Sequence, residues 1–301
     1  MTSVPPPFQH PGPPPPRPEV PEGVHVPEPA GPDAPPPLGV PVWAPFAALL
    51  GTFVAVLFLG VLVAIVVGVG GGELDTDSTG LTLGLTVLQA GILVGTAWYT
   101  VGALSDRRPT LASFGVRRTP ALRALGWAAL AYVGFWVAAL IILVAFGQPE
   151  DQQLAQDIEN EDAFAVLAGY AVLSCFLAPI AEEFFFRGFM FRAIAERVHW
   201  IWAAVITGAV FGVIHAPGSP AESVLVLGLF GVALCVLLWR TGSLIPCIML
   251  HAFNNSISFG STKGLPWWGF LLLVVGSVGM TLLVCLLAVR LGARRAAPAP
   301  A

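Results

Sequence analysis

The stretch that most constrains the fold reads Ala178-Pro179-Ile180-Ala181-Glu182-Glu183-Phe184-Phe185-Phe186-Arg187. Two adjacent glutamates lie at the end of a long apolar run, and three phenylalanines follow them directly. On membrane-insertion scales, a charged side chain at the bilayer centre costs about 2.5–3.5 kcal/mol. Because Arg187 comes four residues after Glu183, the two share one face of a helix and are predicted to pair. Glu182 points about 100° away and therefore needs a partner from elsewhere in the chain.

The composition outside this stretch is also that of a membrane protein. Of the 301 residues, 56% are hydrophobic and 11% are charged, whereas soluble domains carry about 25% charged residues. We therefore expect an all-α polytopic membrane protein with the lipid bilayer as its main environment. The formal net charge is only −4, and no basic cluster indicates a nucleic-acid partner.

Residues 1–41 form a separate segment that is rich in proline. They contain 17 of the 28 prolines in the chain. Such a composition favours a disordered or polyproline II-like tail rather than a packed domain. The helical membrane domain is predicted at residues 42–290, and residues 291–301 form a short C-terminal tail.

The apolar segments of the membrane domain predict about eight transmembrane helices, since about 20 residues are enough to cross a bilayer. Pro179 is expected to kink the fourth of them, because proline removes a backbone hydrogen bond and crowds the preceding turn. The expected helices cover about residues 42–72, 81–104, 125–146, 163–197, 200–216, 223–239, 244–259 and 267–289.

The arginines predict the orientation in the membrane. The segments after the second, fourth and sixth helices and the C-terminal tail hold nearly all of them, whereas the segments after the first and third helices are acidic. The positive-inside rule then places both termini in the cytoplasm of a multi-pass cell-membrane protein. An even number of crossings agrees with this assignment.

Three further polar residues fall inside apolar segments. His215 ends the fifth predicted helix, and His251 and Asn255 share one face of the seventh because they are four residues apart. If the chain turns near residues 198–199, Glu182 and His215 lie at similar depth, each about 25 Å from the turn.

Small and aromatic residues accompany this set. Gly208 and Gly212 form a small-xxx-small face that allows a neighbouring helix to approach closely near His215. Phe211 shares a face with His215 and can wall the site.

A Glu, two His and an Asn in this arrangement favour hydrolysis of an acyl bond. A glutamate beside a histidine can activate water, and a His–Asn pair can stabilise an oxyanion. The same residues are compatible with zinc held by Glu182, His215 and His251, with water at the open position. A third interpretation is purely structural, since buried His and Asn often join helices. The chain has no HExxH, GxGD or GxSxG sequence, which excludes the other common intramembrane and serine hydrolase patterns.

Taken together, three motifs resemble those of the CPBP family, which includes CAAX prenyl endopeptidases and proteins similar to lysostaphin resistance protein A. They are Glu182-Glu183-x-x-x-Arg187, Phe211-x-x-x-His215 and His251-x-x-x-Asn255. The resemblance covers about residues 105–260 and includes the element Phe114-Gly115-Val116-Arg117-Arg118.

The resemblance implies a CAAX-type intramembrane endopeptidase. Glu182 and His215 would activate water, and His251 and Asn255 would stabilise the oxyanion, while Glu183, Arg187 and Phe211 would support them. The family includes enzymes described as metalloproteases and enzymes described as glutamate-dependent, so no cofactor is certain and zinc remains an alternative. The expected substrate is a membrane-associated peptide or protein that can carry a lipid.

Two other functions compete with the protease. The same fold could act as a non-catalytic scaffold or a bacteriocin-immunity protein, in which the polar cluster serves packing. A proton-coupled transporter could also use buried Glu and His, although the sequence has no internal repeat or matching pair of broken helices.

Overall fold

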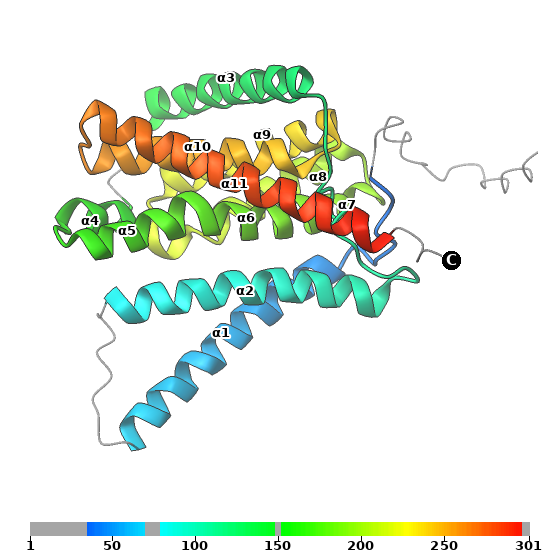
Figure 1. Cartoon of the computed structure of the whole chain (residues 1–301), viewed down its shortest axis with the longest axis horizontal. Helices are drawn as coiled ribbons and strands as arrows, with labels where there is room; N and C mark the ends of the chain where they lie inside the picture. The colour runs from blue at the N-terminus through cyan, green and yellow to red at the C-terminus, as the bar shows by residue number, and fades with distance from the viewer. Residues whose placement is uncertain (1–34, 70–78, 148–151, 297–301) are drawn as a thin grey trace, which may run out of the picture.

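The computed structural model describes residues 35–69, 79–147 and 152–296, in which all regular structure is helical (Figure 1). Seven helices are long and apolar enough to cross a membrane by length and composition. The prediction of an all-α polytopic membrane protein is thereby confirmed. The long rods are α1 (Ala44–Val69), α2 (Thr79–Leu104), α3 (Ala121–Phe146), a composite rod (Phe164–Ala195), α8 (Trp200–Val213), α9 (Ala221–Thr241), α10 (Leu244–Thr262) and α11 (Trp267–Ala296).

The eighth predicted span is present as a helix but differs in character from the others. Helix α10 has 19 residues, yet it is not among the seven apolar spans of the described chain. Its polar side chains, including His251, Asn254 and Asn255, lower its hydropathy. Because His251 is buried within the protein, the polarity of α10 faces neighbouring helices instead of lipid.

The composite rod is continuous but changes its helical geometry along its length. It consists of α5 (Phe164–Val172), the π-helix η1 (Leu173–Leu177), α6 (Ala178–Glu182), the π-helix η2 (Glu183–Phe191) and α7 (Arg192–Ala195). The disturbance expected at Pro179 is a π-helical turn immediately before it, in which the N–H of Ala178 donates to the carbonyl of Leu173. Such π segments are rare and often occur at functional sites.

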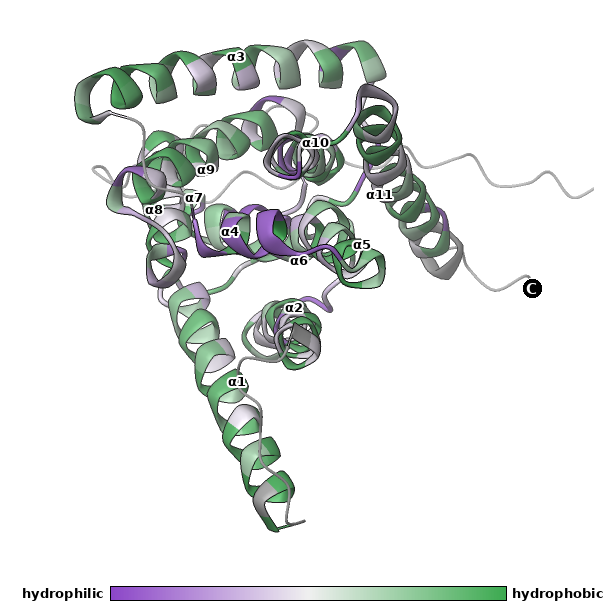
Figure 2. Cartoon of the chain, turned by 90° about the vertical axis from the view of Figure 1, so that its left-hand side faces the viewer, coloured by the Kyte–Doolittle hydropathy of each residue, from purple (hydrophilic) through white to green (hydrophobic). Residues whose placement is uncertain are grey.

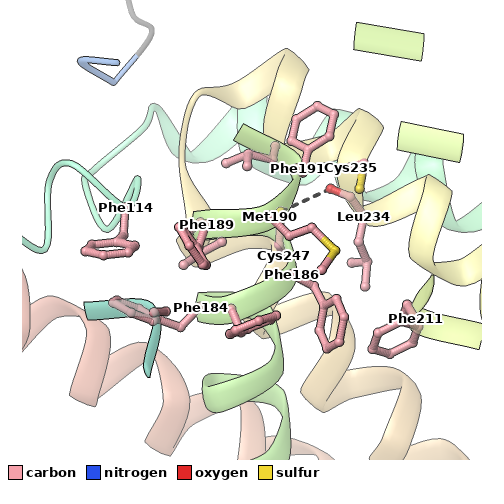
Figure 3. Packing of buried hydrophobic residues seen from close by; sticks show 14 of the residues in the cluster. Phe114, Phe184, Phe186, Phe189, Met190, Phe191, Phe211, Leu234, Cys235 and Cys247 are labelled. Carbon is pink, nitrogen blue, oxygen red and sulfur yellow. Dashed lines mark hydrogen bonds between the residues drawn. The ribbon is translucent and has the colours of Figure 1, made fainter. Parts of the chain in front are cut away.

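The core surrounds the second half of this rod. Every residue from Glu183 to Phe191 is buried, and the phenylalanines among them pack into a cluster with Phe211 and Phe114 (Figure 3). The Phe114 ring stacks on Phe184 with 4.3 Å between centroids. The basic element recognised in the sequence thus also carries a core aromatic side chain, which fastens the segment before α3 to the rod.

Helices α8 and α9 approach each other closely through glycines. A Cβ added to Gly208 would lie 2.7 Å from the carbonyl oxygen of Gly228, and one added to Gly231 would lie 2.8 Å from the Cα of Gly208. The small-xxx-small face expected on this helix is therefore real, and its partner is α9.

The segment before α1 is packed where a disordered tail was expected. Within residues 35–40, Leu38 and Val40 are fully buried. The carboxylate of Glu196 accepts two backbone N–H groups of this segment, and the Arg192 guanidinium donates to two of its carbonyls. The structure therefore differs from the expectation for these last residues of the tail, while residues 1–34 lie outside the described residues.

A short helix in the acidic segment after α3 was also not predicted. Helix α4 (Gln153–Asn160) is hydrophilic and lies at one end of the molecule (Figure 2). Its buried Ile158 packs in a small cluster with Tyr170 and Phe259. Lys263 Nζ donates to two backbone carbonyls at the C-terminal end of α4, those of Glu159 and Glu161. Eight residues with one apolar anchor carry too weak a sequence signal to distinguish this helix from a loop.

Candidate active site

Glu183 is the centre of the polar cluster, and its side chain is fully buried. Its Oε1 accepts from Arg187 Nη1 at 2.7 Å, which confirms the predicted pair. The same oxygen lies 2.8 Å from Nδ1 of His251 on α10. Glu183 therefore joins the rod to α10, a role that sequence reasoning missed because i, i+4 spacing reveals only contacts within one helix.

The contact with Glu183 occupies one ring nitrogen of His251 and leaves the other available for a further contact. A carboxylate bound by Arg187 is an acceptor, so Nδ1 carries the proton and donates it. The other nitrogen, Nε2, lies 3.9 Å from Oε2 of Glu182. The Glu182 side chain is 20% exposed, whereas Glu183 is fully buried. The two adjacent glutamates thus have different environments, as the sequence predicted.

His215 lies just beyond α8 and is held in a similar manner. Its Nδ1 lies 2.7 Å from the carbonyl oxygen of Phe211. Since a carbonyl only accepts, this nitrogen also carries a proton and Nε2 is left free. The two rings pack with centroids 4.9 Å apart, so Phe211 does wall this residue as expected.

The packing of α8 against the rod bears on the prediction that Glu182 and His215 lie at similar depth in the membrane. Phe211 packs against Phe186 with ring centroids 5.2 Å apart. For antiparallel helices, this pairing is consistent with the prediction that Glu182 and His215 lie at similar depth. The turn between the helices comes at residues 196–199, close to the expected position.

Asn255 is anchored to the backbone of the rod. Its Nδ2 donates to the carbonyl oxygen of Ser174 at 2.8 Å. That carbonyl is left without its usual helical partners, because Ala178 donates to Leu173 and the next residue, Pro179, has no N–H. The π turn and the proline together therefore create the acceptor that orients Asn255.

Two neighbouring residues extend this arrangement. Asn254 Nδ2 donates to Oδ1 of Asn255 at 3.5 Å, and Tyr132 Oη on α3 donates to Oδ1 of Asn254 at 3.4 Å. Both contacts are long, so they contribute less than the bond to Ser174. Sequence reasoning missed Tyr132, because nothing in the α3 sequence indicates which face meets α10.

Aromatic rings enclose the buried part of the cluster. The Arg187 guanidinium lies 4.4 Å from the centroid of the Phe211 ring, and the His251 ring meets Phe211 and Phe230 edge-on at 5.9 and 5.4 Å. The rings keep water from the ion pair, which strengthens its electrostatics. Arg187 Nη2 has no hydrogen-bond partner, and the Phe211 ring offers it a cation–π contact instead.

The residues present do not form the zinc site considered from the sequence. Within the described ranges, no three His, Cys, Asp or Glu side chains are grouped so that they could hold a metal ion. Oε2 of Glu182 lies 3.9 Å from Nε2 of His251, and no third side chain of these types joins the two in a metal-binding group within the described ranges. The structure therefore does not support the metalloprotease alternative.

Comparison with known proteins agrees with the location of the cluster. Residues 164–257 match the family described as Type II CAAX prenyl endopeptidase Rce1-like. This range contains the rod, α8, α9 and the part of α10 that carries His251 and Asn255.

A curated relative points in the same direction. The chain is 26% identical over 120 residues to the "Putative membrane peptidase YdiL" of Bacillus subtilis (strain 168), an alignment that covers 40% of this chain and 47% of the relative. The similarity thus spans about half the length of that relative. No solved structure matches this chain. Residues 164–257, which carry all three motifs, are thus similar to the Rce1-like type II CAAX prenyl endopeptidase family.

Proposed function

We propose that this protein is an intramembrane endopeptidase that hydrolyses a peptide bond of a membrane-associated or lipid-modified substrate. The observation that carries the proposal is the position of Glu182, whose Oε2 lies 3.9 Å from Nε2 of His251. The match of residues 164–257 to a family named for endopeptidase activity supports it. The site is carried by apolar membrane helices, so the substrate must reach it from within or alongside the bilayer.

Glu182 is the proposed general base. It is the partly exposed carboxylate of the pair, so water can reach it, whereas the Glu183 side chain is fully buried and already holds Arg187 and His251. His215 presents a free Nε2 on the opposite helix and assists in orienting the attacking water. A positioned base of this kind contributes about 10²–10⁴-fold to a rate.

His251 and Asn255 are the proposed oxyanion donors. With a hydrogen on each ring nitrogen, His251 would donate from Nδ1 to Glu183 and from Nε2 to the developing oxyanion. The Asn255 amide carries two N–H groups, of which one bonds Ser174 and the other remains for the substrate.

The test compares wild-type protein with Glu182→Gln, which preserves size and removes the base. Membrane peptidomes of cells expressing each form reveal peptides that arise only with the wild type. Purified proteins in proteoliposomes are then given a farnesylated CAAX peptide, the same peptide without lipid, and any peptide that the first step finds. We expect Glu182→Gln to lower cleavage about 100-fold or more while leaving thermal stability unchanged.

The matched control is Glu222→Gln, at the start of α9, which removes a carboxylate outside the cluster and should leave cleavage intact. Equal cleavage by Glu182→Gln and the wild type would refute the proposed mechanism. If neither form cleaves any peptide and both support the same cellular phenotype at equal protein levels, the scaffold or immunity function replaces the protease.

A further inference from the structure

A groove lies between α1 and α2, lined by none of the residues of the candidate active site. Its volume is about 560 Å³, within the range of about 300–1,000 Å³ that is typical of small-molecule pockets. Small residues of both helices form its floor, among them Ala47, Gly51, Gly95 and Ala103. Below it, the hydroxyls of Thr52 and Thr96 bond at 2.9 Å and close the helix crossing.

The length of the groove indicates what can occupy it. Its lining runs from Trp43 to Gly51 on α1 and from Ile92 to Leu104 on α2. At 1.5 Å per residue, these stretches are about 12 and 18 Å long. The hydrocarbon core of a bilayer is about 30 Å thick, so the groove covers a single leaflet. A transmembrane helix crosses both leaflets, whereas the acyl chains of one lipid fill one.

The rim of the groove has the features of a membrane–water interface. Trp43 and Tyr99 line it and are 57% and 75% exposed, as expected of aromatic residues at headgroup level. The bend that follows Leu104 exposes Arg107 and Arg108 together with Asp106, so its net charge is positive.

We propose that this groove binds a glycerophospholipid with an anionic headgroup. Its acyl chains lie on the small residues between α1 and α2, and its phosphate lies at the level of Arg107 and Arg108. Basic residues immediately beyond a transmembrane helix favour anionic headgroups, which separates this lipid from a zwitterionic one. The proposal involves neither Glu182 nor its neighbours and stands whether or not the chain is a peptidase.

The first test fills the groove. A Cβ added to Gly51 or Gly95 meets no atom within 4 Å, and both residues line the groove, so Gly51→Leu/Gly95→Leu is designed to fill it. The matched control is Gly60→Leu/Gly84→Leu, two equally open positions on the same helices outside the groove. The full-length protein is supplied with equal amounts of phosphatidylglycerol and phosphatidylcholine. Native mass spectrometry then measures how many molecules of each lipid remain bound.

The expected result is that wild type and control retain phosphatidylglycerol and the filled variant loses it. The second test is Arg107→Gln/Arg108→Gln, which should lower the preference for phosphatidylglycerol over phosphatidylcholine by about tenfold. Retention of lipid by the filled variant overturns the site. The proposed selectivity for an anionic headgroup is refuted if the wild type binds both lipids equally. It is also refuted if the arginine variant keeps the same preference.

Discussion

At the residue scale, the two adjacent glutamates have different structural roles. Glu183 is fully buried and contacts both Arg187 and His251, whereas Glu182 is partly exposed and approaches only the far nitrogen of His251. Burying a charge is costly unless it is paired and hydrogen-bonded. The stability of the rod therefore depends on Glu183, and Glu182 is free for chemistry.

This difference predicts the effect of Glu183→Gln on stability. The substitution leaves Arg187 as a buried charge without its partner, which costs about 3–5 kcal/mol. Unfolding in detergent, followed by tryptophan fluorescence, measures this loss of stability. Glu182→Gln serves as the comparison and should lose little stability. The double variant Glu183→Gln/Arg187→Met should recover much of the stability, because the orphaned charge is gone. If Glu183→Gln is as stable as the wild type, the ion pair does not hold the rod.

Pro179 is predicted to be a positioning residue through its missing N–H. In Pro179→Ala, the new N–H can donate to the Ser174 carbonyl and compete with Asn255 Nδ2. We expect peptide cleavage to fall towards the level of Asn255→Ala, with KM nearly unchanged, because the proposed oxyanion donor is misplaced. Pro179→Ala in the background of Asn255→Ala should cause no further loss. If the losses of cleavage caused by the two substitutions add in the double variant, Pro179 does not act through Asn255.

At the element scale, close contact between α8 and α9 sets the position of Phe211 and His215. The glycines bring the two backbones together, since a Cβ on Gly208 would lie 2.7 Å from the Gly228 carbonyl oxygen and 2.9 Å from the backbone nitrogen of Val232. Backbone atoms cannot move aside as flexible side chains do. The interface therefore tolerates no added carbon without separating the helices.

Gly208→Ala is accordingly predicted to destabilise the protein by about 1–3 kcal/mol, the usual cost of overpacking. Gly134→Ala in α3 is the matched control, because its Cβ meets no atom within 4 Å and alanine favours a helix more than glycine does. Thermal unfolding of both variants checks the prediction. Equal behaviour of the two would show that the α8–α9 contact does not limit stability.

At the scale of the whole molecule, charge separates the two ends of the bundle. The arginine-rich bend after α2 and the last turn of α9, which carries Arg240, lie at the end of the bundle where α11 ends, and α4 lies at the other end (Figure 1). Residues 35–40 are held at the arginine end by Arg192 and Glu196. We propose, by the positive-inside rule, that this end and both termini are cytoplasmic.

Cysteine labelling tests this orientation. The four native cysteines are buried, so a membrane-impermeant maleimide should report on single introduced cysteines. In intact cells we expect Asp162→Cys to react, and Arg108→Cys to react only after permeabilisation. The reverse pattern would invert the orientation. The turn at residues 196–199 precedes α8, and His215 follows its C-terminal end, so the two lie at opposite ends of this helix. The labelling pattern therefore also shows which membrane surface is nearer to His215.

The sequence by itself was enough for several features of this protein. Long uncharged segments must be membrane helices because only a helix satisfies its own backbone in lipid, and the i, i+4 spacing of Glu183 and Arg187 determines their pairing. The three motifs indicated a resemblance to the CPBP family because they stand in the right order on separate helices. Counting residues on either side of one turn predicts that Glu182 and His215 lie at a shared depth.

Only the tertiary structure decided how the helices meet. The bond between Glu183 and His251 joins residues 68 positions apart, and no local period encodes such a contact. The Ser174 carbonyl accepts from Asn255, 81 positions away. The packing of residues 35–40 depends on Arg192 and Glu196, more than 150 positions away. Local spacing determines which residues share a face of a helix, but the packing of the bundle determines what that face contacts.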